Sequence, residues 1–164
     1  MTTIYKRAGT RDELIAAAVD SWMADNLYRP VPAPPPGESL ADGLMRIFRH
    51  VFEPWERNPG MLRAYHYVRC GPCGQALERR AWEAIEPSAR IVLSGAPPEY
   101  TADIDLILTH VADGLIVRFA AGEITAAGIL PLLDRVVRRL TSDNSSEAAT
   151  AGTRRRAGEL RTSD

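Results

Sequence analysis

Apolar residues recur every three or four positions along most of the chain, and this periodicity constrains the fold more than any other feature. Such spacing predicts amphipathic helices. No stretch shows the alternation of apolar and polar residues typical of a half-buried strand, and no internal repeat is present. The sequence therefore predicts an all-α fold, a helical bundle. The expected helices cover about residues 10–27, 40–55, 59–68, 75–94, 99–121 and 125–140.

Two segments lack this periodicity. Residues 29–37 read RPVPAPPPG, and five prolines remove amide donors and favour a stiff, extended path, so we expect a linker. Residues 141–164 contain almost no large apolar side chains, which predicts a disordered tail. Arg154, Arg155 and Arg156 are expected to be a solvated run of charge within it. One helical domain over residues 10–140 is the expected organisation.

The composition excludes several classes of protein. The chain has 164 residues and a formal net charge of −1, so it lacks the bulk basic character of many nucleic-acid binders. Any DNA contact must therefore be local. No apolar run approaches the roughly 20 residues of a membrane helix, and the N-terminus lacks the order of a signal peptide. Cys70 and Cys73 lie too close together for a long-range disulfide framework, so we expect a cytoplasmic protein.

The last two expected helices are apolar on two sides. Leu106 and Ile116 lie off the main stripe of the first, and Leu132 and Val136 lie off that of the second. A helix of this kind is central in its domain or shared with a partner, and C-terminal helices of a small domain are seldom central. We therefore predict a homodimer through these helices. The residues expected at its interface are Leu108, Leu115, Leu130, Leu133 and Val137.

Aromatic residues gather around a proline inside the second expected helix. Pro54 must release the carbonyl near His50 and kink that helix, and a kink beside aromatic rings can open a cavity. The rings are either ordinary core or the lining of an apolar pocket, in which His66 or a tyrosine hydroxyl orients an amphipathic ligand. Both interpretations stay open. The candidate ligand-binding residues are Phe48, Phe52, Trp55, Tyr65, His66 and Trp82.

Residues 70–73 read CGPC, the tetrapeptide of thioredoxin-like oxidoreductases, whose first thiolate follows a strand and starts a helix. Here the preceding segment is helical, so a Gly-Pro turn between two helices explains the sequence without redox chemistry. A thiol oxidoreductase stays the less favoured alternative. His66, Cys70 and Cys73 offer three metal ligands where a structural zinc site needs four. We expect no metal, no cofactor and no catalytic residue.

The chain opens with TTIYKRAGTRDEL at residues 2–14. Thr10 with Glu13 three residues later makes a capping box, so a helix is expected to start there, after a turn at Gly9. Hydroxyl and cationic side chains surround this point, where free backbone amides also favour phosphate. They are candidate DNA contacts. These residues are Thr2, Thr3, Tyr5, Lys6 and Arg11.

The stretch TTIYKRAGTRDELIAAAV resembles the end of the DNA-binding domain in the tetracycline-repressor (TetR) family. Tyr5 matches the tyrosine of the recognition helix, and Arg11 stands where the family usually has a phosphate-contacting lysine. Leu14 matches the leucine that ties the next helix to the DNA-binding head. Ala8 departs from the pattern, because the family normally has a bulky aromatic residue there. Further along, ERNPGMLRAY is similar to ligand-binding domains of actinobacterial repressors, including those that control steroid catabolism.

This resemblance implies an all-helical, homodimeric repressor that releases DNA when a small apolar or amphipathic effector binds. It also implies that residues 1–9 are the remnant of a recognition helix and that the helices packed behind it are missing. We therefore expect an N-terminally truncated family member that binds operator DNA weakly or not at all unless the missing helices are present. A DNA-free fragment that dimerises and binds ligand is the alternative.

Overall fold

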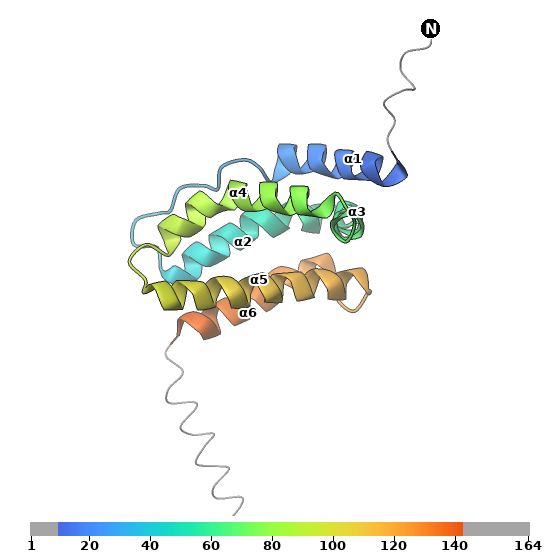
Figure 1. Cartoon of the computed structure of the whole chain (residues 1–164). Helices are drawn as coiled ribbons and strands as arrows, with labels where there is room; N and C mark the ends of the chain where they lie inside the picture. The colour runs from blue at the N-terminus through green and yellow to red at the C-terminus, as the bar shows by residue number, and fades with distance from the viewer. Residues whose placement is uncertain (1–9, 143–164) are drawn as a thin grey trace, which may run out of the picture.

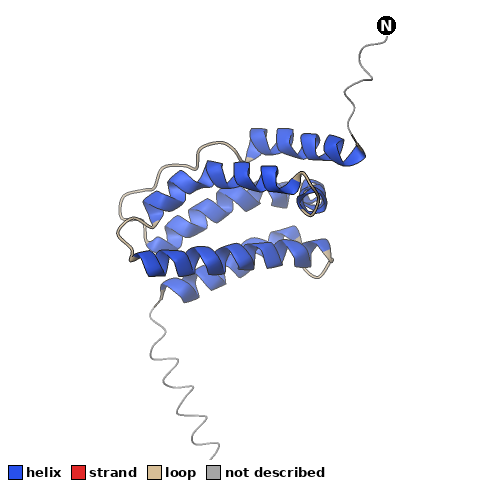
Figure 2. Ribbon diagram, viewed as in Figure 1, coloured by secondary structure: helices blue, strands red, loops and turns tan. Residues whose placement is uncertain are grey.

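The computed structural model describes residues 10–142, and all regular secondary structure within that range is helical (Figures 1 and 2). This confirms the predicted all-α class. None of the helices in this range is long and apolar enough to cross a membrane. The elements are α1 (Arg11–Asn26), α2 (Leu40–Arg57), α3 (Pro59–Arg69), α4 (Gly74–Val92), α5 (Pro98–Ala120), the short 3₁₀ helix η2 (Ala126–Gly128) and α6 (Ile129–Thr141).

Local capping fixes the start of α1. The backbone N–H of Glu13 donates to Thr10 Oγ1 at 3.3 Å, and the backbone N–H of Thr10 donates to Glu13 Oε2 at 2.7 Å. Together these bonds form the predicted capping box, which satisfies two donors that a helix N-terminus otherwise leaves open. The helix therefore has a defined first residue, Arg11, and this first turn becomes important for the site.

The helices pack in layers (Figure 1). α5 and α6 lie together on one side of the bundle, α2 and α4 occupy the middle, and α1 covers the opposite side. α3 runs across the others at one end of the bundle, where it contacts α1, α4 and α5. This arrangement puts the end of α3 directly against α1.

Two clusters of apolar side chains form the core. The larger joins residues of all six α-helices and includes the fully buried Val19, Leu62 and Ile129. The smaller lies between α2, α5 and α6 and includes Met45 and Val137. Burial of this kind contributes roughly 25 cal/mol per Å² of apolar surface, so these clusters hold the bundle together.

The proline-rich linker lies between α1 and α2, as the composition predicts, and one arginine holds it in place. Arg46 on α2 donates from Nη1 to the Pro32 carbonyl at 2.6 Å and from Nε to Glu38 Oε1 at 2.8 Å. Both side chains of the ion pair are largely buried. The linker has an extended path without regular backbone hydrogen bonds of its own, and the Arg46 side chain holds it against α2.

Most of the residues predicted at a dimer interface lie inside their own chain. Leu133 and Val137 are 0% exposed, and Leu108 and Leu115 are also buried in the core clusters, while Leu130 is half-buried between them. The apolar stripe of the last two helices therefore faces α2 and the core. Other residues form the outward-facing surface of these helices, and they are described below.

Candidate functional site

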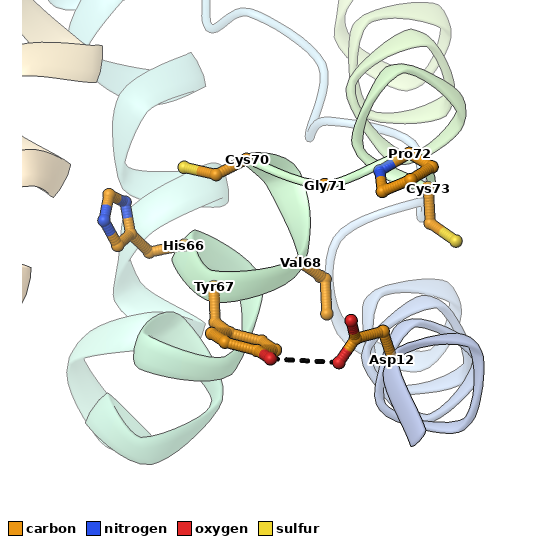
Figure 3. Close-up of a pocket in the computed structure, with 8 residues that line it drawn as sticks. All are labelled: Asp12, His66, Tyr67, Val68, Cys70, Gly71, Pro72 and Cys73. Atoms are coloured by element: carbon orange, nitrogen blue, oxygen red, sulfur yellow. Dashed lines mark hydrogen bonds between the residues drawn. The ribbon is translucent and has the colours of Figure 1, made fainter. Parts of the chain in front are cut away.

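A hollow of about 400 Å³ lies where the first turn of α1 meets the end of α3 and the turn into α4 (Figure 3). Its lining comes from two segments that are far apart in the sequence, one of them the CGPC turn. The lining residues are Asp12, His66, Tyr67, Val68, Cys70, Gly71, Pro72 and Cys73.

Glycine makes the turn between α3 and α4 tight. An ideal Cβ atom on Gly74 would lie 2.0 Å from the Arg69 carbonyl oxygen and 2.8 Å from Arg69 Cα, so the backbones of these residues touch. The Gly71 N–H donates to the Val68 carbonyl at 3.1 Å, and the Gly74 N–H donates to the Gly71 carbonyl at 3.0 Å. The last residue of α3 and the first of α4 are therefore held against each other.

One hydrogen bond ties α3 to α1 across the hollow. The Tyr67 hydroxyl donates to Asp12 Oδ1 at 3.0 Å (Figure 3). This bond to the carboxylate is the main reason that the pKa of Tyr67 lies above its ordinary value. Tyr67 is exposed, so the bond contributes little to stability, but it connects the end of α3 to the first turn of α1.

His66 carries an unpaired polar atom. Its Nδ1 is buried and has no hydrogen-bond partner among residues 10–142. Leaving a buried polar atom without a partner costs on the order of 1–3 kcal/mol, and proteins seldom accept that cost without a reason. A ligand that forms a hydrogen bond with this nitrogen would remove that free-energy cost.

Arg69 anchors the wall behind the hollow. Its guanidinium pairs with Glu78 of α4 at 3.0 Å and with Asp113 of α5 at 2.9 Å, and it lies 5.7 Å from the ring centroid of Tyr65. The Arg69 side chain is largely buried, whereas both carboxylates are partly exposed. Burial raises the pKa of Tyr65 to about 12, so its hydroxyl keeps its proton well into the alkaline range.

The predicted aromatic pocket is mostly core. Phe52, Trp55 and Tyr65 are buried, and the Trp55 ring centroid lies 5.4 Å from that of Tyr65 and 4.3 Å from that of Trp22. Trp82, in contrast, is 45% exposed on α4. The core interpretation therefore accounts for the three buried rings, while a ligand role for them stays a prediction.

The six candidate ligand-binding residues do not come together at one hollow. His66 lines the hollow of Figure 3, and Phe48 is half-buried between the two core clusters, with its ring centroid 6.3 Å from that of Phe52. Asp12 and Tyr67 line the same hollow as His66. No local signal pairs these two, because they are 55 positions apart.

A second hollow, of about 500 Å³, lies between the linker and the first half of α2. Its charged residues Glu38 and Arg46 already satisfy each other through hydrogen bonds of 2.8 and 2.9 Å, and this pairing lowers the pKa of Glu38. The hollow at the α3–α4 turn is the better candidate, because one of its lining residues, His66, has a buried nitrogen without a hydrogen-bond partner among residues 10–142.

The two thiols lie on the CGPC turn in different surroundings. Cys70 is exposed at the end of α3, Cys73 is half-buried before α4, and Figure 3 shows their sulfur atoms on opposite sides of the turn. The turn joins two helices and follows no strand. Within residues 10–142, no group of three or more His, Cys, Asp and Glu side chains is placed to hold a metal ion.

Of the candidate DNA contacts, only Arg11 falls within the described residues. It is the first residue of α1 and is exposed. Thr2, Thr3, Tyr5 and Lys6 lie outside the described residues, and so does the predicted tail from residue 143 onward.

All-helical bundles commonly hold small-molecule sites between their helices. Residues 37–140 match the family model described as "Tetracyclin repressor-like, C-terminal domain". The chain therefore belongs to the TetR family, whose members are ligand-binding transcriptional regulators rather than enzymes. Comparison with curated proteins and with solved structures gives no match.

Proposed function

We propose that this chain is the effector-binding and dimerisation part of a TetR-family repressor in the cytoplasm, and that a small apolar or amphipathic effector releases its DNA. The observation that carries the proposal is the buried, unpaired Nδ1 of His66 beside a hollow of about 400 Å³. Hollows of roughly 300–1,000 Å³ with few polar groups are typical of small-molecule sites. The effector is expected to place one hydrogen-bonding group at His66 and its apolar part along the rest of the hollow.

The aromatic rings behind the hollow are proposed as further contacts and as reporters. Tyr65 precedes His66 on α3 and touches the Trp55 ring, which in turn touches Trp22 of α1. An effector bound at His66 would contact the residue next to Tyr65 in the sequence, and Tyr65 is in ring contact with Trp55. Effector binding should therefore change tryptophan fluorescence, even when the rings themselves stay closed. Phe48, Phe52 and Trp82 are proposed to contact only the apolar end of a long effector.

The proposed signal runs from α3 to α1. An effector at His66 acts on the end of α3, where the Tyr67 hydroxyl holds Asp12 in the first turn of α1. That turn begins at Arg11 and follows residues 1–9 in the sequence. Residues 1–9 contain the other proposed DNA contacts, which are Thr2, Thr3, Tyr5 and Lys6. Leu14, which is 55% exposed on α1, is proposed to pack against the DNA-binding head. Moving the first turn of α1 would thus reposition the DNA contacts.

The proposed dimer uses the outer face of α5. Leu106 and Val117 are 58% and 52% exposed, and they share this face with Ile107 and Gly114. A side chain added at Gly114 would meet nothing within 4 Å, so this part of the helix is open to the close approach of another helix. Exposed apolar side chains along one face favour a protein partner, and a second copy is the partner typical of the family.

Fluorescence titration tests the proposed effector site. The chain is titrated with a panel of fatty acyl and steroid compounds, which are amphipathic and include the class suggested by the resemblance to steroid-catabolism repressors. We expect a saturable change in tryptophan emission with at least one compound. His66→Ala should weaken that binding about tenfold, the loss expected for one hydrogen bond to a buried group.

His110→Ala is the matched control, because His110 is an exposed histidine on α5, far from the hollow in the sequence. It should leave the affinity unchanged. Absence of a response to every compound in the panel, or equal affinities for His66→Ala and the unmodified chain, would contradict the proposed site.

A further inference from the structure

The CGPC turn contains two thiols that the proposed effector binding does not use. Cys70 and Cys73 are the only cysteines of the chain, and both line the hollow. Cys70 is exposed to reagents in solution, and Cys73 packs against the larger core cluster. An exposed thiol three residues from a half-buried one is an arrangement in which the first can be oxidised and the second can resolve the product.

The backbone already brings the two cysteines close together. Arg69 and Gly74 are in backbone contact, with an ideal Gly74 Cβ only 2.0 Å from the Arg69 carbonyl oxygen. Cys70 and Cys73 lie between these two residues in the sequence, so the same contact keeps them near each other. A disulfide needs a Cα separation of roughly 4.4–6.8 Å, a distance that residues three positions apart can reach within a tight turn.

The side chains, in contrast, are not yet aligned. Figure 3 shows the Cys70 sulfur on the side of His66 and the Cys73 sulfur on the other side of the turn. Cys70 is free to rotate because it is exposed, but Cys73 must leave its contact with the core cluster to meet it. Formation of a disulfide would therefore change the end of α3 and the first turn of α4.

We propose that Cys70 and Cys73 form a reversible intrachain disulfide in response to peroxide, and that its formation weakens the hydrogen bond between Tyr67 and Asp12. The Cys70 thiolate attacks hydrogen peroxide, which breaks the O–O bond and leaves a sulfenic acid and one water. The Cys73 thiol then displaces the sulfenic oxygen as a second water. Two thiols are thus oxidised and one peroxide is reduced, with no further reactant.

Tyr67 links the thiol pair to α1. It lies on α3 one turn before Cys70, and its hydroxyl holds Asp12 at 3.0 Å. Because Cys70 is the C-terminal cap of α3, a bridge that pulls on Cys70 distorts the last turn of this helix. The oxidation state of the thiols is in this way transmitted to the first turn of α1.

Intact-mass spectrometry tests the formation of the bridge. The full chain treated with a slight excess of hydrogen peroxide should lose two hydrogen atoms in mass and both alkylatable thiols together, and dithiothreitol should restore them. Cys70→Ser and Cys73→Ser should each abolish this product. A product dominated by sulfinic acid or by bridges between chains, with no intrachain bridge, would overturn the proposal.

Hydrogen–deuterium exchange tests the link to α1. Amides at residues 10–14 should exchange several-fold faster in the oxidised chain than in the reduced one. Tyr67→Phe should already show the faster exchange when reduced and should not change further on oxidation, although its disulfide still forms. A disulfide in the unmodified chain that leaves exchange at residues 10–14 unchanged would overturn the switch.

Discussion

Gly74 has less space for a side chain than any other glycine between residues 10 and 142. A Cβ atom there would lie 2.0 Å from a backbone oxygen of Arg69, and backbone cannot move aside as a flexible side chain can. The usual gain from replacing glycine by alanine in a helix, at most about 1 kcal/mol, is therefore outweighed. The contact explains why the turn between α3 and α4 requires glycine at its end.

Gly74→Ala is accordingly expected to lower the free energy of unfolding by about 2 kcal/mol or more, as overpacking of a tight contact does. Urea denaturation measures it. Gly60→Ala is the matched control in the first turn of α3, because its Cβ would meet only Asn58 at 3.7 Å. The control should be neutral or slightly stabilising. Equal stability of the two variants would contradict the contact between Gly74 and Arg69.

Tyr65 should make the fold sensitive to alkaline pH. Burial raises its pKa to about 12 in the folded chain, against the ordinary value of 10.0 for tyrosine, so the folded chain keeps the proton where the unfolded chain loses it. The contribution of Tyr65 to stability is therefore fully present below about pH 10 and is lost between about pH 10 and 12, by on the order of 2 kcal/mol. Burial, together with the hydrogen bond to Asp20, also raises the pKa of Tyr28, which adds to the same loss.

Urea denaturation at pH 8 and pH 11 checks this pH dependence. Tyr65→Phe should reduce the difference in stability between the two pH values, and Tyr28→Phe should remove a further part. If Tyr65→Phe kept the full alkaline loss of the unmodified chain, burial of the Tyr65 hydroxyl would not be its cause.

At the scale of the elements, Arg69 joins three helices with one side chain. It extends from α3 to Glu78 of α4 and Asp113 of α5. Arg69→Ala should lower the free energy of unfolding by about 1–3 kcal/mol, through lost charged hydrogen bonds and lost packing on Tyr65. Thermal unfolding provides the measurement.

The matched control for this arginine is Arg79→Ala. Arg79 pairs with Glu83 on the exposed face of α4, and such pairs are worth less than about 0.5 kcal/mol. A loss for Arg69→Ala as small as that of the control would show that the three helices do not depend on this residue.

The helices follow from the sequence because their signals are local. The capping box of Thr10 and Glu13 and the Pro59 start of α3 are read within a few residues, and both are present. The pair Tyr67–Asp12 joins positions 55 residues apart, and no local pattern indicates it. The hollow could therefore not be placed from the sequence, although His66 was named as a ligand group.

The apolar stripe of α6, which was predicted to form the dimer interface, shows a second limit of what apolar periodicity can predict. The spacing of Leu133 and Val137 says that one side of α6 is apolar, but not whether that side faces its own core or another chain. In the structure it faces the core, and both residues are 0% exposed. The outward apolar residue Leu106, which is 58% exposed, appeared in the sequence only as a residue off the stripe.

Sedimentation can therefore separate the interface from the core. The double variant Leu106→Glu and Val117→Glu should be a folded monomer, because it places charge on an exposed face that a partner would cover. Leu133→Asp buries a charge within the chain and should instead lose the helical circular dichroism signal. An unmodified chain that sediments as a monomer, or a double variant that stays dimeric, would contradict the α5 interface.

At the scale of the whole molecule, the hydrogen bond from α3 to α1 crosses the boundary of the matched family domain. Residues 37–140 match the TetR C-terminal domain, and the bond joins Tyr67 inside this range to Asp12 before it. The family domain begins after α1, and α1 is the helix that follows the proposed DNA contacts. An effector bound at the end of α3 would act on both sides of that boundary. Its binding should therefore change the structure in two separate parts of the sequence, residues 66–73 and residues 10–14.

Chemical-shift mapping by NMR, on the labelled chain with a compound that binds in the fluorescence titration, tests this account most directly. Backbone amide shifts should concentrate at residues 66–73 and extend to residues 10–14 through the bond between Tyr67 and Asp12. In Tyr67→Phe, the shifts at residues 66–73 should persist and those at residues 10–14 should shrink. Shifts confined to other parts of the bundle, with residues 66–73 unaffected, would contradict it.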